Sequence, residues 1–219
     1  WLEQKDGSVQ WNFTVDENIV CMQLTGLLIK IDRASSSISY YKPDGTLLLK
    51  ERKKDSRTME AFQSYRVEQA GQTTHIQTAD GVKTFVKDAV RVPDKQLYHT
   101  RMHFEWQQGE ALYGLGQHEE GVLNLRGHQV YLHQANRKIA IPLLVSSLGY
   151  GILINTSSTM IFSDTEYGSY LYTEAVPQLD FYFINGEGMD GVVREYRRLT
   201  GKASMLPRWA FGYLQSQER

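Results

Sequence analysis

The chain has 219 residues, of which 41% are hydrophobic and 22% are charged, and its formal net charge is −1. This length and composition indicate a water-soluble globular protein with one large domain or two small ones. The near-zero charge excludes the strongly basic surface by which proteins bind nucleic acid or anionic membranes. The single cysteine, Cys21, can form neither an internal disulfide bond nor a cysteine-based metal site.

Alternation of hydrophobic and polar residues, which is typical of strands with one buried face, dominates the chain. It is clearest at Trp11, Phe13 and Val15, where it predicts a half-buried strand. In chain order, strands are predicted over residues 9–15, 27–31, 38–41, 47–49, 101–106, 167–172 and 179–183. Pro43, Asp44 and Gly45 lie between two of these segments and combine a fixed φ angle with tolerance of positive φ, as a turn requires.

Two segments could be mistaken for functional signals. Residues 50–57 (KERKKDSR) are the densest basic stretch, but two acidic residues interrupt it, so we expect a solvated loop. Residues 139–154 are the longest hydrophobic run, and they are too short to cross a bilayer. Serine, glycine and proline residues within that run predict two strands joined by a turn over residues 146–149.

Only residues 188–200 predict a helix. The helical spacing is carried by the hydrophobic residues Met189, Val192, Val193, Tyr196 and Leu199. Gly201 follows as the expected C-terminal cap. Many short strands with one late helix predict a mainly β protein, a large antiparallel β-sandwich with a C-terminal connecting helix. Residues 207–219 (PRWAFGYLQSQER) then predict the start of a buried strand, which indicates that the chain is part of a longer protein.

Three ordered segments resemble family 31 glycoside hydrolases, the α-glucosidases and α-xylosidases. Residues 206–219 are similar to the family's crossing into the first strand of its TIM barrel, where a proline precedes Trp-Ala/Ser-Leu/Phe-Gly, an aromatic residue and Gln-Ser/Cys-x-x-Arg. Residues 112–117 (LYGLGQ) resemble the aromatic-Gly-Leu/Phe-Gly-Glu segment, with Gln117 in place of glutamate. Residues 139–155 resemble two sandwich strands that follow a loop near the active site, and the predicted helix lies where the family has its connecting helix.

The resemblance implies three regions: a galactose-mutarotase-like β-sandwich over residues 1–187, a connecting helix and linker over 188–206, and the first strand of a truncated catalytic (β/α)8 barrel over 207–219. It also implies a retaining enzyme that removes terminal α-xylosyl or α-glucosyl residues from oligosaccharides without a metal or other cofactor. Both catalytic aspartates of the family lie on the barrel, so we expect no catalytic residue in this chain and no activity from the chain alone.

The expected partners are an oligosaccharide substrate and the protein's own catalytic barrel, with no nucleic acid and no membrane. The oligomeric state and the choice between xylose and glucose stay open. The kind of relative resembled favours a secreted or periplasmic role, although the sequence itself does not identify the compartment.

The resemblance also suggests where sugar contacts lie, because sandwich loops in this family reach over the barrel mouth. The candidate substrate-binding residues are His133, Gln134, Asn136 and Arg137. Their imidazole, amide and guanidinium groups can hydrogen-bond sugar hydroxyls. Gln117 and His118 are further candidates. The adjacent Glu119 and Glu120 suit a catalytic pair poorly, because neighbouring side chains in an extended segment point apart.

An alternative hypothesis is a non-catalytic carbohydrate-binding module, in which aromatic side chains stack on sugar faces. The aromatic residues considered for this role are Trp106, Tyr167, Tyr170 and Tyr172, although packing in a core is the simpler use of such residues. Cofactor motifs are not convincing. Gly114 and Gly116 lack the third glycine of a dinucleotide-binding loop, and His118, His128 and His133 would come together only through folding.

Overall fold

The computed structural model of the chain describes residues 10–68, 73–86 and 90–215. Its elements are β1 (Trp11–Val15), β2 (Ile19–Leu24), β3 (Leu28–Asp32), β4 (Ile38–Tyr41), β5 (Leu47–Glu51), β6 (Arg57–Glu68), β7 (Thr73–Thr78), β8 (Gly81–Val86), β9 (Val90–Glu105), β10 (Leu112–Gln117), β11 (Gln129–Leu132), β12 (Ile139–Ser146), β13 (Tyr150–Ile154), β14 (Met160–Thr165), β15 (Gly168–Val176), β16 (Phe181–Asn185), α1 (Gly188–Thr200) and a 3-10 turn, η1 (Arg208–Phe211). The predicted mainly β fold with one α-helix is confirmed.

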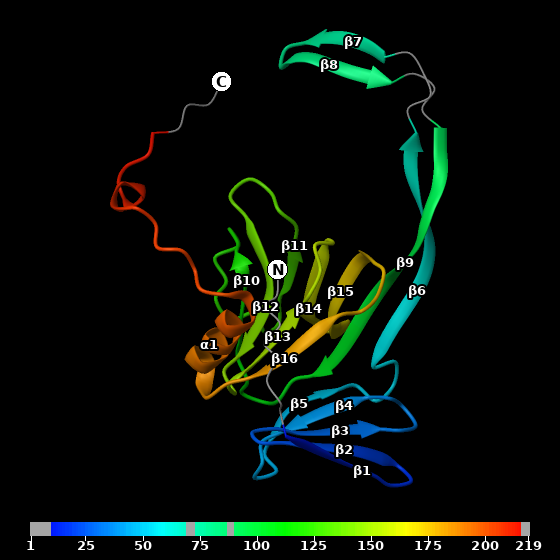
Figure 1. Ribbon diagram of the computed structural model, residues 1–219, viewed down its shortest axis with the longest axis vertical. Helices are drawn as coiled ribbons and strands as arrows, with labels where there is room; N and C mark the ends of the chain where they lie inside the picture. The colour runs from blue at the N-terminus through cyan, green and yellow to red at the C-terminus, as the bar shows by residue number, and fades with distance from the viewer. Residues whose placement is uncertain (1–9, 69–72, 87–89, 216–219) are drawn as a thin grey trace.

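Two antiparallel sheets form the body of the molecule (Figure 1). A 10-stranded sheet has the order β1-β2-β3-β4-β5-β9-β15-β14-β11, with β6 paired to β9, and a 4-stranded sheet has the order β10-β12-β13-β16. Their facing side chains make the main core, in which Tyr40 of the large sheet stacks on Phe183 of the small sheet with ring centroids 3.9 Å apart. Met102 and Phe162 from the large sheet are also almost fully buried there.

The small sheet is buried on both faces because α1 covers the face that points away from the large sheet. Val192 of α1 packs with Leu143, Val145 and Leu153 in a second hydrophobic cluster. The helix lies so close that a Cβ added at Gly151 would be 2.6 Å from a Val192 methyl group. This three-layer arrangement explains why residues 143–145 and 150–154 are buried without alternation, since strands covered on both faces do not alternate, whereas Ile139 and Ile141 at the start of β12 remain exposed.

A long ribbon leaves the body of the sandwich. β6 and the first part of β9 pair over registers from Arg57↔Met102 to Glu68↔Val90, and the β7–β8 hairpin lies at the far end in Figure 1. Most of its side chains are exposed. Continuous backbone pairing therefore holds this ribbon together, with little contribution from buried side chains.

The first strand forms as predicted, but its predicted half-burial is wrong. Trp11, Phe13 and Val15 are each more than half exposed, and Val9 lies outside the described residues. In the register, Phe13 pairs with Met22, which pairs in turn with Ile29. This apolar row extends from the core, but β1 is the outermost strand and the 4-stranded sheet is too narrow to reach it.

The predicted solvated loop over residues 50–57 is also partly wrong, because Glu51 ends β5 with only 2% of its surface exposed. One carboxylate oxygen accepts the Ile38 backbone N–H at 2.9 Å and lies 3.5 Å from the Arg57 guanidinium. The other oxygen has no hydrogen-bond partner in the described part of the chain. Burial raises the pKa of Glu51 to about 7, against the opposing effects of Arg57 and Ile38.

The strand predicted over residues 207–219 is absent from the described portion, residues 207–215. That portion contains the 3-10 turn Arg208–Phe211 and otherwise irregular backbone, with Trp209 73% and Tyr213 86% exposed. A strand needs a neighbour to receive its backbone hydrogen bonds, and no strand of the described residues lies beside this one. Residues 216–219 lie outside the described residues.

The glycines of residues 112–117 are required by a close approach of two backbones. β10 bulges between Gly114 and Gly116 where it pairs with β12, and both glycines have positive φ angles. A Cβ at Gly116 would lie 1.8 Å from the Ile139 carbonyl oxygen, and one at Gly114 would lie 2.5 Å from that of Leu143. Only glycine fits both requirements.

Replacing Gly116 with alanine should therefore disrupt the β10–β12 register and lower the free energy of unfolding by about 4 kcal/mol or more. Gly109 is the matched control, because its φ is also positive but an added Cβ meets nothing within 4 Å. Gly109→Ala should cost only about 1–2 kcal/mol of backbone strain. Urea unfolding of both variants checks this, and equal losses would contradict the close approach.

The raised pKa of Glu51 predicts a pH-dependent stability. The folded state holds the Glu51 proton more tightly than the unfolded state does. The stability that this proton contributes is therefore fully present below the ordinary pKa of 4.5 and is lost as the pH rises to about 7. The stability of Glu51→Gln relative to the parent protein should rise by up to about 3 kcal/mol over that window. Chemical unfolding measured across the window checks this, with Glu60→Gln, at an exposed position on β6, as the matched control.

Candidate functional site

The loop that joins β11 to β12 is a tight turn. Ala135 and Lys138 form an isolated β-bridge, and the Lys138 N–H donates to the Ala135 carbonyl at 3.2 Å. Arg137 has a φ of 63°, which allows the chain to reverse between the two strands. The four predicted substrate-binding residues all lie on this loop and are exposed.

A depression of about 360 Å³ lies at the base of this loop. Its lining includes His133 and Gln134 on one side, Ala140 and Pro142 on β12, and the hydroxyl-bearing residues 156–159 on the other side. Its volume falls within the range of small-molecule sites, and its lining mixes apolar surface with hydrogen-bonding groups. The structure thus brings His133 and Gln134 together in one pocket, whereas Asn136 and Arg137 do not line it.

Gln134 has a structural role as well. Its side-chain nitrogen donates to the Lys138 carbonyl at 2.9 Å, and its side-chain oxygen accepts the Ala140 N–H at 3.3 Å. The amide thus spans the loop from one strand to the other. The His133 ring instead contacts the Tyr131 ring edge-on, with centroids 4.9 Å apart, and its nitrogens make no hydrogen bond to the described residues.

Two ion pairs join this loop to the segment that follows β10. Arg137 lies 3.3 Å from the Glu119 carboxylate, and Lys138 hydrogen-bonds the Glu120 carboxylate. The hydrogen bond from Lys138 is the main cause that lowers the pKa of Glu120. A carboxyl group held in its ionised form is poorly suited to act as a general acid. The expectation that the two glutamates are not a catalytic pair stays a prediction.

Sequence reasoning missed the other wall of the pocket, residues 156–159 (TSST), which link β13 to β14. The same residues border a second depression, of about 600 Å³, with Glu174, Gln178 and Asp180 on its far side. The sequence does contain an indication of this wall, because four consecutive residues with hydroxyl side chains come shortly after a buried strand. The further candidate His118 points elsewhere, since its ring hydrogen-bonds the Leu115 carbonyl at 2.7 Å.

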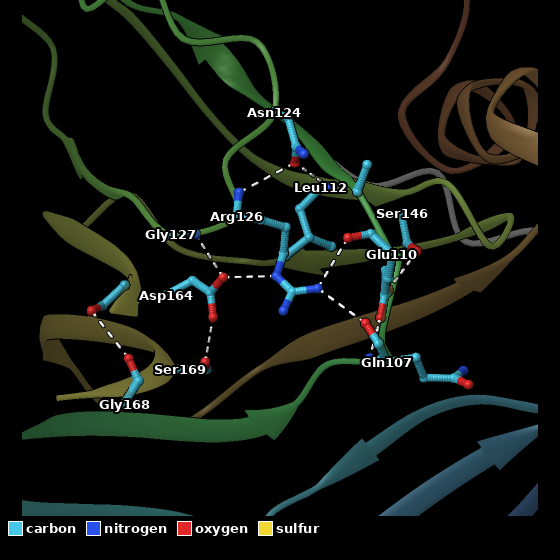
Figure 2. Close-up of polar contacts among 12 residues, drawn as sticks. Gln107, Glu110, Leu112, Asn124, Arg126, Gly127, Ser146, Asp164, Gly168 and Ser169 are labelled. Atoms are coloured by element: carbon cyan, nitrogen blue, oxygen red, sulfur yellow. Dashed lines mark hydrogen bonds and ion pairs between the residues drawn. The ribbon is translucent and has the colours of Figure 1, made fainter. Parts of the chain in front are cut away.

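A partly buried polar network is centred on Arg126, as Figure 2 shows. The Arg126 guanidinium donates to the carbonyls of Gln107 and Glu110 at 3.1 and 3.0 Å and to the Asp164 carboxylate at 2.7 Å. The Glu110 side chain accepts bonds from Ser146 at 2.6 Å and from Tyr150. These contacts join the small sheet to the large one.

The surroundings of Asp164 and Tyr150 in this network shift the pKa values of both side chains. Burial acts to raise the pKa of Asp164, but bonds from Ser169, Gly127 and Arg126 together hold it below its usual value. The pKa of Tyr150 is raised by burial and then by the Glu110 charge. The network is thus a structural support whose hydrogen-bonding groups are satisfied within the protein.

Metal-binding geometry is not found in the part of the chain that the structure describes: no three or more histidine, cysteine, aspartate or glutamate side chains gather there as metal ligands would. Over the same residues, no helix has the length and hydrophobicity needed to span a membrane.

Comparison with known proteins identifies the sandwich. A family model described as the glycosyl hydrolase 31 N-terminal galactose mutarotase-like domain matches residues 2–162. An α-xylosidase of Saccharolobus solfataricus is 41% identical over 131 residues, which are 56% of this chain and 18% of that enzyme. An isomaltosyltransferase of Sporosarcina globispora is 31% identical over 226 residues, covering 94% of this chain and 18% of its own length.

The fold is likewise similar to solved structures. A family 31 α-xylosidase from a soil metagenome, solved with xylose, matches 95% of this chain and 29% of its own with a TM-score of 0.70 at 22% identity. At this identity the likeness establishes the fold. The chain spans less than a fifth of the length of the two curated relatives above.

Removing the Gln134 amide should loosen the loop without unfolding the sandwich. In Gln134→Ala, hydrogen exchange at the backbone amide of Ala140 should increase on the order of tenfold, because one of its partners is lost. Asn136→Ala is the control, since the Asn136 side chain makes no hydrogen bond to the described residues. Equal exchange in both variants would show that the amide does not hold the loop.

Proposed function

The chain belongs to glycoside hydrolase family 31, and we propose that it is the N-terminal part of a retaining enzyme that removes terminal α-xylosyl or α-glucosyl residues from oligosaccharides. The observation that carries the proposal is the family match over residues 2–162, together with a hydrogen-bonding pocket beneath the 133–138 loop. The name of the α-xylosidase relative supports the xylosyl assignment. A second relative is named an α-glucosidase.

The pocket suits a sugar. Serine and threonine hydroxyls donate and accept hydrogen bonds, and imidazole nitrogens are also hydrogen-bonding groups, as paired sugar hydroxyls require. His133 and residues 156–159 present such groups across the same depression. We propose that this loop end faces the catalytic barrel and forms part of the sugar pocket, with His133 the contact among the four predicted residues.

The cleavage itself is assigned to residues beyond this chain. Retaining glycosidases need two carboxyl groups about 5–5.5 Å apart, one as nucleophile and one as acid and base. Glu119 and Glu120 are each engaged by a basic residue of the neighbouring loop. This supports the expectation that the catalytic aspartates lie on the barrel.

We also propose that the chain is divided into three regions. Residues 1–187 are proposed as the sandwich domain, 188–206 as the connecting helix and linker, and 207–219 as the first barrel strand. The exposure of Trp209, Phe211 and Tyr213 supports the last assignment, because such a hydrophobic segment would be buried once other barrel strands pair with it.

Extending the chain by several hundred residues of the parent gene should restore hydrolysis of aryl α-xyloside or aryl α-glucoside, whereas the 219-residue chain should be inactive. The preferred aryl glycoside then identifies the sugar. Equal activity in the shorter chain would refute the assignment of the catalytic carboxylates. Sugar binding by the short chain with no hydrolysis by either chain would favour a non-catalytic carbohydrate-binding module.

In the extended chain, His133→Ala should lower kcat/KM for the preferred aryl glycoside roughly tenfold through loss of a hydrogen bond to the sugar, with an unchanged melting temperature. His75→Ala is the control, because His75 lies on the β7–β8 hairpin, away from the pocket. An unchanged kcat/KM in His133→Ala would remove His133 from the sugar pocket.

A further inference from the structure

A third depression, of about 870 Å³, lies at the opposite end of the β11–β14 pair from the 133–138 loop. The two ends are fixed by the register, which runs from Leu132↔Met160 beside the loop to Gln129↔Ser163 beside this depression. It is lined by Arg126, Gly127, Gln129, residues 163–167 and Tyr170. We refer to it as the β14–β15 hollow.

The hollow opens on the solvent face of the large sheet. Phe162 and Leu171 are paired across β14 and β15 and point into the core, so the next pair, Ser163 and Tyr170, points outward. At the hairpin turn, Tyr167 is 88% exposed. The hollow therefore places two tyrosine rings beside polar groups on a surface that does not face the small sheet.

The hollow has a rigid base. Asp164 is only 8% exposed, and its carboxylate accepts bonds from Arg126 at 2.7 Å, from the Gly127 N–H at 2.9 Å and from Ser169 (Figure 2). Arg126 is in turn held by two carbonyls of the preceding loop. Anchoring Asp164 in this way fixes the backbone at the start of the hairpin turn that carries Tyr167, whose N–H also bonds the Thr165 hydroxyl at 3.3 Å.

The binding groups at the rim are not used by the protein itself. Among the described residues, the side chains of Tyr167, Gln129 and Glu166 have no hydrogen-bond or ring partner. The cation at Arg126 is neutralised by Asp164, so the hollow does not attract a phosphate or another anion. An exposed aromatic ring beside amide and carboxylate groups suits a neutral ligand with apolar faces and hydroxyl edges.

We propose that the β14–β15 hollow is a second carbohydrate-binding site, in which a sugar ring of a neutral oligosaccharide or polysaccharide stacks on Tyr167 and hydrogen-bonds Gln129 and Glu166. The location follows from the structure, and the ligand class rests on the proposed function. The site lies at the opposite end of the β11–β14 pair from the proposed sugar pocket, so it holds a different part of a long substrate, or a second chain.

The test measures retardation of the 219-residue chain in native gels that contain soluble xyloglucan or dextran. The parent chain should be retarded by at least one of these polymers, and Tyr167→Ala should weaken that binding roughly tenfold. Tyr65→Ala is the control, since Tyr65 is 60% exposed on the β6–β9 ribbon, outside the hollow. Circular dichroism should show the same fold for both variants.

Undiminished binding by Tyr167→Ala, or no retardation of the parent chain by either polymer, would overturn the second site. Binding that is lost in His133→Ala but kept in Tyr167→Ala would also overturn it, because it would assign the binding to the pocket beneath the 133–138 loop. Failure of the proposed function is distinguishable, since it would appear as an inactive extended chain on small aryl glycosides.

Discussion

The structure depends on a buried polar network between its two sheets. Arg126 ties two carbonyls of one loop to Asp164 of the large sheet, while the Glu110 side chain in the same loop binds Ser146 and Tyr150 of the small sheet. Buried polar groups are costly unless their hydrogen bonds are made, so a network of this kind favours one arrangement of the sheets over others. Hydrophobic packing alone is less specific, because it accepts many shapes of similar volume.

The contacts of this network extend in two directions from the interface between the sheets. On the network's far side, Asp164 anchors the β14–β15 turn and thereby the β14–β15 hollow. Asn124 is part of the same region and accepts the backbone N–H of Leu112, where β10 begins. β10 then approaches β12 through its glycine bulge and leads into the loop that forms ion pairs with Arg137 and Lys138. The network thus contacts the β14–β15 hollow directly, whereas it is linked to the 133–138 loop only through the length of β10.

Several features were predictable from sequence because they depend on neighbours along the chain. Helical spacing predicted α1, and the serine and glycine residues between two hydrophobic segments predicted the β12–β13 turn. The 133–138 loop could be selected by resemblance, but which of its residues line a pocket could not. Gln134 and Arg137 are both polar and exposed, yet one spans the loop internally and the other pairs with Glu119 across space.

The sequence by itself determined the β-sandwich class, the helix over residues 188–200 and the family, because periodicity and motifs are local properties of the chain. Only the tertiary structure decided which hydrophobic faces are covered, where Glu51 is buried, and that residues 156–159 complete a pocket. It also decided that Trp11 and Phe13, despite a regular strand pattern, remain exposed at the sheet edge. Burial depends on which other layer lies opposite, and that information is held by residues far away in the chain.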